Sequence, residues 1–216
     1  ALNLLLLSLG LASITLVLLV NHQTQQAFAR DLAGIDVVVG AKGSPLQLIL
    51  SGVFQIDTPT GNVPLADVQA LQANPQVAKL IPISMGDSFK GYRIIGTTPD
   101  YVSHYAGVMA SGALWQAPMQ AVLGAKVARN TGLRVGDSFV GSHGLGGGGH
   151  AHGQTPYTVT GVLAPSGSVM DRLILTATES VWRVHEKDTA LDAADQKILE
   201  EEREVTLALI QYRSPL

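Results

Sequence analysis

The sequence LLLLSLGLASITLVLLV, residues 4–20, contains no charged side chain, and the first charge along the chain is Arg30. A helix at the surface of a soluble protein would show a polar face, whereas this run is apolar on every side. Its length is close to the roughly 20 residues that cross about 30 Å of hydrocarbon. The run therefore predicts a transmembrane helix.

A cleaved signal peptide is the alternative for this run. It would need a basic start, an apolar segment of only about 7–15 residues and a small-residue cleavage site. No basic residue precedes the run, and Asn21-His22-Gln23 follows it. We therefore favour the membrane helix. We also expect the sequence to be part of a longer protein, since it begins at Ala1 without flanking charges.

Composition excludes several classes of protein. The 216 residues include no cysteine, which excludes disulfides, thiolate metal clusters and a thiol nucleophile. The formal net charge is −3, and lysine and arginine do not cluster. Because a nucleic-acid surface needs a basic stripe against the phosphates, we expect no nucleic-acid partner.

The remainder of the chain predicts an α+β fold in two lobes. After a polar helical stalk, β-branched runs alternate with helical segments, which indicates helices layered on a sheet. From Pro99 onward short strands and turns dominate. The predicted organisation is a transmembrane helix and stalk at 1–33, the first part of a membrane-proximal α/β lobe at 34–98, an inserted β-rich lobe at 99–185, and a helix and strand returning to the α/β lobe at 186–216.

Turn and capping residues predict the individual elements. Ser44-Pro45 predicts the start of a helix over 46–54. Met85-Gly86-Asp87 predicts a turn between strands at 77–84 and 89–96. Further predicted elements are strands at 35–39, 120–124, 133–140, 156–163, 172–176 and 205–212, and helices at 65–74, 125–131 and 188–204. We expect the last strand to join the first layer, because the chain must return to the membrane if more membrane helices follow.

Two motifs are typical of catalysis but lack its context. Gly40-Ala41-Lys42-Gly43-Ser44 lies between a predicted strand and helix, where loops bind phosphate, yet its lysine precedes the glycine and the Walker A spacer is missing. Gly-Asp-Ser occurs at 86–88 and 136–138, whereas a serine nucleophile needs an activating histidine and oxyanion donors. We interpret all three as structural turns.

Three histidines lie in the glycine-rich segment from Ser142 to Gly153: His143, His150 and His152. Their imidazoles could converge on one Zn²⁺, Ni²⁺ or Cu²⁺, and such binding would weaken as pH falls because the ligand is neutral histidine. The alternative is a glycine linker, since ordering so many glycines costs much conformational entropy. Zinc is the candidate cofactor. We interpret His22 and His104 as ordinary polar positions.

The order of several segments resembles a known family. Behind the single apolar helix come Asp36-Val37-Val38-Val39-Gly40, the segment 121–128 (AVLGAKVA), 132–137 (GLRVGD), 157–163 (YTVTGVL), and Gly167-Ser168 through Asp171-Arg172. In this order they resemble the extracytoplasmic core of MacB/FtsX-like ABC transporter permeases. The resemblance covers nearly the whole chain, although each piece alone is ordinary strand and turn sequence.

The resemblance implies a permease subunit of four membrane helices, with a two-lobed periplasmic domain between the first and second. It implies a homodimer or heterodimer of permeases in the bacterial inner membrane, driven by a separate cytoplasmic ABC ATPase subunit. It also implies a periplasmic substrate-binding or adaptor protein as a further partner. The function expected is transport or mechanical work on a periplasmic substrate, without catalysis by this chain. A zinc-binding module for metal import or sensing is the alternative.

Overall fold

The computed structural model describes residues 1–143, 156–186 and 202–214. It divides into two compact units, Ala1–Ala33 and Gly34–Leu216. The helix predicted over 188–204 lies mostly outside the described residues, so that prediction stays untested.

The first unit is one helix, α1 (Leu2–Leu32), of 31 residues. Its leucines, isoleucine and valines are exposed, and the helix is long and apolar enough to cross a membrane. The hydroxyls of Ser8 and Ser13 donate to the carbonyls of Leu5 and Leu9 at 2.9 and 2.8 Å. Such back-bonding satisfies the hydroxyl groups in the apolar first part of the helix. The predicted apolar N-terminal helix is thus confirmed.

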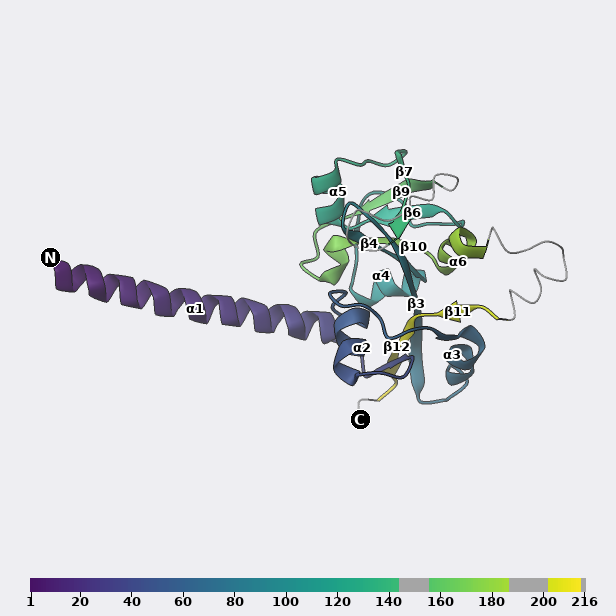
Figure 1. Cartoon of the computed structure of the whole chain (residues 1–216), viewed down its shortest axis with the longest axis horizontal. Coiled ribbons are helices and arrows are strands. Elements are labelled where there is room, and N and C mark those ends of the chain that lie inside the picture. Colours follow the sequence, from purple (N-terminus) through teal and green to yellow (C-terminus); the bar gives the residue numbers. More distant parts are fainter. Residues whose placement is uncertain (144–155, 187–201, 215–216) are drawn as a thin grey trace. The chain divides into compact units, whose positions relative to one another are not determined.

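The second unit contains strands and short helices (Figure 1). The strands are β1 (Val37–Gly40), β2 (Val63–Pro64), β3 (Val77–Phe89), β4 (Tyr92–Thr97), β5 (Met109–Gly112), β6 (Gln120–Leu123), β7 (Ser138–Phe139), β8 (Ser142–His143), β9 (Tyr157–Leu163), β10 (Leu173–Ala177), β11 (Glu204–Val205) and β12 (Leu207–Tyr212). The helices are α2 (Pro45–Gly52), α3 (Leu65–Leu71), α4 (Pro99–His104), α5 (Ala125–Thr131), the 3₁₀ helix η1 (Val169–Arg172) and α6 (Thr178–Glu186). Three helices were predicted at the positions of α2, α3 and α5, whereas α4 and α6 were not predicted.

One mixed sheet organises the described part of this unit. Its order is β1-β12-β3-β4-β10-β6-β9-β5, with β7 beside β9 and β8 beside β3, while β11 and β2 form a separate pair. This is the mixed fold class that the sequence predicted. Because β4 and β10 pair in parallel, hydrogen bonds cross the predicted boundary between residues 34–98 and 99–185. The division into two lobes stays a prediction.

The β3–β4 hairpin corrects one predicted turn. β3 continues through Met85-Gly86-Asp87, and the chain reverses instead at Lys90 and Gly91, whose φ angles are 48° and 81°. Two left-handed residues between the paired Phe89 and Tyr92 fit the right-handed twist of a hairpin. The Gly-Asp pair misled the prediction because it occupies a bulge, where the register with β4 shifts between Met85 and Ser88.

The strand predicted over 133–140 is also wrong for most of its length. Only Ser138–Phe139 is a strand. The preceding residues form a turn, in which Asp137 Oδ2 accepts the backbone N–H of Arg134 at 2.8 Å. A carboxylate that binds nearby backbone in this way competes with strand pairing.

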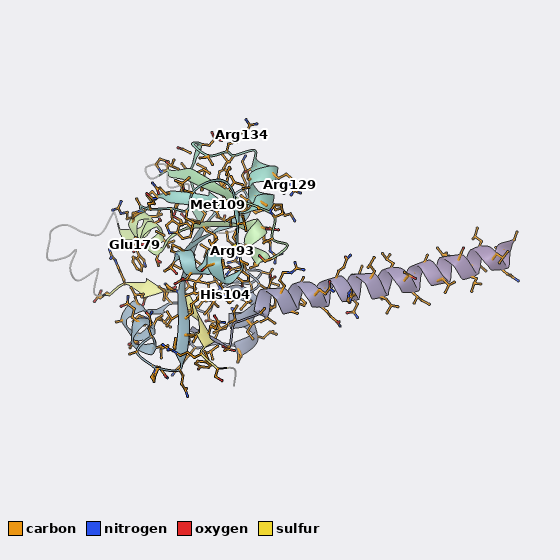
Figure 2. The ribbon with its side chains drawn as sticks, turned by 180° about the vertical axis from the view of Figure 1, so that it is seen from behind. Arg93, His104, Met109, Arg129, Arg134 and Glu179 are labelled. Carbon is orange, nitrogen blue, oxygen red and sulfur yellow. The ribbon has the colours of Figure 1, made fainter. Side chains whose placement is uncertain are left out.

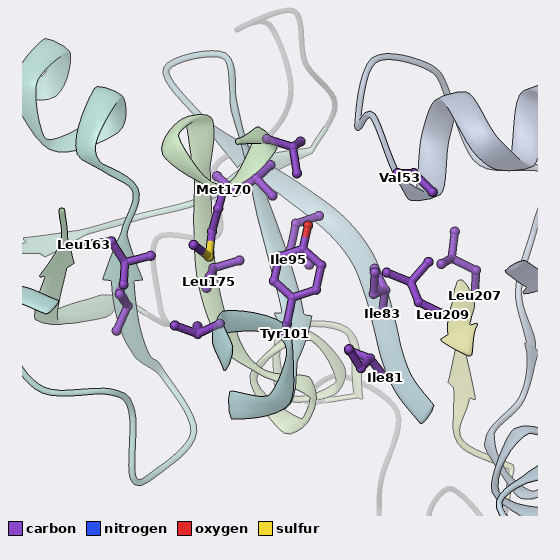
Figure 3. Close-up of a cluster of buried hydrophobic side chains, with 14 of the residues drawn as sticks. Val53, Ile81, Ile83, Ile95, Tyr101, Leu163, Met170, Leu175, Leu207 and Leu209 are labelled. Carbon is purple, nitrogen blue, oxygen red and sulfur yellow. The ribbon is translucent and has the colours of Figure 1, made fainter. Parts of the chain in front are cut away.

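The central hydrophobic cluster joins β3, β4, β10 and β12 to α2, α4 and η1 (Figure 3). Tyr101 of α4 is fully buried in its middle, beside side chains such as Ile95 and Leu175. A smaller cluster lies between α3 and the β1–β12–β3 edge of the sheet. These clusters bury the apolar faces that hold the unit together.

An aromatic stack fills the third cluster. The Phe139 ring lies 5.3 Å from Tyr157, nearly parallel, and 4.9 Å from Phe89. Burial raises the pKa of the Tyr157 phenol well above its ordinary value, and the Asp87 carboxylate raises it further. The folded chain therefore holds this proton under conditions in which the unfolded chain releases it.

This difference predicts a loss of stability in alkali. The free energy of unfolding should fall as pH rises through about 10, where the unfolded tyrosine ionises. Tyr157→Phe keeps the ring and removes the proton, so its unfolding free energy should fall less than that of the wild type between about pH 8 and about pH 11. Urea unfolding at the two pH values measures this. Equal losses in the two proteins would contradict the assignment.

Candidate functional site

The first candidate site is the place where the chain enters β1 and leaves β12. The two strands are antiparallel, with Val37 opposite Ile210 and Gly40 opposite Leu207. The backbone N–H of Asp36 donates to the Ile210 carbonyl at 2.9 Å, and Asp36 Oδ2 accepts the backbone N–H of Tyr212 at 2.7 Å. We call Gly34–Asp36 together with Ile210–Tyr212 the joint. It fixes the incoming and outgoing chain side by side, and it confirms the prediction that the last strand returns to the first layer.

A glycine gives the joint its shape. Gly34 has a φ of +76°, which a residue with a side chain rarely adopts. A Cβ at this position would also lie 3.1 Å from His104 Cε1 and 3.4 Å from Gln211 Nε2. The backbone angle at Gly34 therefore favours glycine, and any side chain there would also have to displace the His104 ring slightly.

The joint connects to the central cluster through α4. The His104 ring stands edge-on to Tyr105 at 4.8 Å, and the Tyr105 ring is 5.1 Å from the buried Tyr101. Rings packed in this way transmit displacement, because close-packed interiors resist compression. His104 is thus part of the packing around Gly34 and not the ordinary polar position predicted from sequence.

The Asp36 carboxylate is the testable element of the joint. Asp36→Ala removes an acceptor at an exposed site, which should cost about 1 kcal/mol and raise hydrogen exchange at the Tyr212 amide about fivefold. Asp36→Asn keeps a carbonyl acceptor and should exchange more slowly than the alanine variant. Amide exchange followed by NMR measures both. An unchanged rate in Asp36→Ala would show that the carboxylate does not hold Tyr212.

A second feature lies beyond α2, in residues 53–60, which we call the clasp loop. Arg93 of β4 donates from Nη2 to the Asp57 carbonyl at 2.7 Å, and Arg172 of η1 donates from Nη2 to the Phe54 carbonyl at 3.2 Å. Gln47 of α2 donates from Nε2 to the Thr58 carbonyl at 3.0 Å. The clasp loop is thereby tied to helix α2, to the central strand β4 and to the 3₁₀ helix η1.

The glycine-rich turn at 40–44 is filled by the chain itself. The Thr60 hydroxyl donates to the Ala41 carbonyl at 2.9 Å, and the Thr60 side chain occupies the space where a Cβ on Gly43 would lie. A phosphate cradle needs open backbone N–H groups at this position. The structure thus agrees with the interpretation of this segment as a structural turn.

The two Gly-Asp-Ser triplets occupy different structures. Gly86-Asp87-Ser88 belongs to the bulge of β3, and Gly136-Asp137-Ser138 forms a turn that enters β7. In the second triplet the Asp137 carboxylate accepts a hydrogen bond from the backbone N–H of Arg134. A structural role for the second triplet is therefore visible in its hydrogen bonding.

The three predicted metal ligands cannot be compared with one another in this structure. His143 ends β8, where its backbone is opposite Asp87 of β3. His150 and His152 lie outside the described residues. Among the side chains described, those of residues 1–142, 156–184 and 202–214, no group of three histidine, aspartate or glutamate residues is placed to hold a metal ion. The zinc site stays a prediction.

Calorimetric titration of the full chain with Zn²⁺ tests this prediction. Saturable binding that is lost when His143, His150 and His152 are all changed to alanine would support zinc binding by the histidine segment. His22→Ala is the matched control, because His22 lies on α1 and should leave binding unchanged. Heats no larger than those of the buffer would leave the segment as a linker.

Sequence interpretation missed the groups that build the joint and the clasp loop. Asp36 precedes a β-branched strand, and Arg93 interrupts an otherwise uncharged run between Tyr92 and Gly96. A single charge within such a run signals either a solvent-facing position or a buried partner. The partners, a strand end and a loop carbonyl, are distant in sequence and leave no local pattern.

Comparison with known proteins gives a family and two similar folds. The model of the family described as the MacB-like periplasmic core domain matches residues 1–208. The periplasmic region of MacB from Actinobacillus actinomycetemcomitans superposes with a TM-score of 0.49 at 13% identity, covering 86% of this chain and 79% of that one. The extracellular domain of the noncanonic ABC-type transporter YknZ from Gram-positive bacteria gives 0.46 at 11% identity, covering 82% and 84%. No curated protein matches the chain.

Proposed function

Since this chain belongs to the MacB-like periplasmic core domain family of ABC-type transporter permeases, we propose that it couples a cytoplasmic ATPase to work on a periplasmic substrate. The observation that carries the proposal is the family match over residues 1–208, which includes both the apolar helix and the sheet-rich unit. In this function the chain is a mechanical element, and ATP hydrolysis belongs to a separate subunit.

The apolar helix supports a membrane location. α1 has the length to cross the hydrocarbon layer and leads by a short connection into β1. We propose that it lies in the bacterial inner membrane, with the second unit in the periplasm. A complete ATP-binding loop is missing from the sequence, which is consistent with a partner ATPase.

The joint supports coupling. A movement of the segment before Ile35 displaces β1, because the two are continuous in the chain. The hydrogen bonds of Asp36 to Ile210 and Tyr212 then displace β12 together with β1. The stack from His104 to Tyr101 leads from there into the central cluster. We propose that this route carries displacement from the membrane into the sheet, in a dimer of permease subunits with an adaptor or substrate-binding protein outside.

Spin labels test the coupling in the assembled permease with its ATPase in lipid nanodiscs. These 216 residues contain no cysteine, so in an assembly whose other cysteines are replaced, Lys126→Cys on the exposed face of α5 provides one label per copy. A non-hydrolysable ATP analogue should shift the distance between the labels of two copies. Two glycines inserted between Gly34 and Ile35 should reduce that shift, because a flexible connection transmits less displacement.

The matched control carries the same two glycines between Val135 and Gly136, in the exposed turn before β7. It should keep the full shift. Nucleotide binding by the ATPase is measured in parallel, so that a failure to assemble is recognised. The same label distances with and without nucleotide, in a complex that binds nucleotide, would contradict the coupling.

A further inference from the structure

A pocket of about 360 Å³ opens where β3 changes its neighbour. Residues 77–83 of β3 pair with β12, whereas Asp87 and Ser88 pair with β8. Met85 and Gly86, which lie between these two ladders, line the pocket together with Thr58 and Pro59 of the clasp loop. The pocket is lined by Thr58, Pro59, Met85, Gly86, Asp87, Ser88, Arg93 and Ile94.

The walls of the pocket are largely apolar, and among the described residues that line it the charged ones are Arg93 and Asp87. Pro59, Met85 and Ile94 contribute apolar side chains. Arg93 contributes its guanidinium, and Figure 2 labels Arg93 within the body of the unit and Arg129 and Arg134 nearer its edge. Small-molecule sites commonly combine apolar walls with a few polar groups that orient the ligand.

The guanidinium of Arg93 uses only part of its hydrogen-bonding capacity. Nη2 donates to the Asp57 carbonyl at 2.7 Å, and Nη1 has the weakly accepting Met85 Sδ at 3.8 Å. Within the described residues, Nε is buried without a hydrogen-bond partner. A guanidinium carries five N–H donors, and a desolvated cation is costly unless an anion neutralises it. Arg93 therefore has both the charge and the donors to bind a carboxylate.

Of the two aspartates near the pocket, Asp57 offsets the charge of Arg93 only in part. Asp57 Oδ1 accepts the Thr58 backbone N–H at 2.7 Å. The Asp87 carboxylate is directed toward Gly141, where a Cβ would lie 2.9 Å from Oδ2, and its charge acts on Tyr157. Burial lowers the pKa of Arg93, and the Asp57 charge raises it in part. The cation is thus partly desolvated, and its hydrogen bonds go to a carbonyl and a thioether.

We propose that this pocket binds a carboxylate attached to an apolar group, with the carboxylate on Arg93 and the apolar group against Met85, Pro59 and Ile94. Either the C-terminal residue of a peptide or a free aliphatic acid has this chemistry. The proposal is independent of the coupling function, because it concerns a site inside the second unit.

Calorimetry with the full chain in lipid nanodiscs tests the site, with empty nanodiscs as the blank. N-acetyl-leucine and hexanoate are the two probes, and N-acetyl-leucinamide is the uncharged control. We expect saturable binding of at least one acid. The amide should bind at least about tenfold more weakly, because it lacks the carboxylate that would accept hydrogen bonds from Arg93. Tighter binding of N-acetyl-leucine indicates a peptide terminus, and tighter binding of hexanoate indicates an aliphatic acid.

Two variants and a control locate the binding. Arg93→Gln keeps a donor for the Asp57 carbonyl but loses the charge, and it should weaken acid binding roughly tenfold. Thr58→Trp changes an exposed residue at the rim and should block entry without touching the guanidinium. Arg129→Gln removes an exposed arginine on α5 and should change nothing. Equal binding of acid and amide, equal binding in Thr58→Trp and Arg129→Gln, or no saturable binding of either acid would overturn the proposal.

Discussion

Strand β3 has to satisfy the backbone hydrogen bonds of thirteen consecutive residues, and it does so with three different neighbours. β12 pairs with its first half, β4 runs along the other side of its second half, and β8 pairs near its end. Where one neighbour stops and another begins, a backbone group needs a different partner, and the Thr206 hydroxyl accepts the Met85 N–H at 3.0 Å. The bulge and the pocket both lie at this exchange of neighbours. The pairing of one strand therefore determines where the unit has an opening.

Most elements that are marked by neighbouring residues, such as a helix cap or an apolar run, were predicted from the sequence. Ser44-Pro45 begins α2, and the helix at 125–131 has the predicted bounds and ends at Gly132 in the left-handed conformation. The helix α1 could be predicted from its apolar run alone, without reference to any other part of the chain. In each case the deciding residues are neighbours in sequence, so a pattern is visible before folding.

The misplaced turn shows where such reasoning fails. Gly86-Asp87 has the composition of a turn, but it lies opposite β4 and β8, and pairing across the sheet overrides local preference. The contacts of Asp36, Arg93 and Arg172 are similar, because each links segments more than 30 residues apart in the chain. The order of segments was sufficient to predict the family, whereas the joint and the clasp loop became visible only in three dimensions.

The antiparallel arrangement of β1 and β12 also determines how this edge of the sheet responds to force. The chain enters β1 and leaves β12 at the same end of their ladder, with Val37 opposite Ile210. A force that pulls these two chain segments apart would peel the ladder, loading its hydrogen bonds one after another from that end. A force that moves both segments together leaves the ladder unloaded and displaces the sheet as one body. This edge of the sheet thus yields when the two segments are pulled apart, but it transmits a push that acts on both.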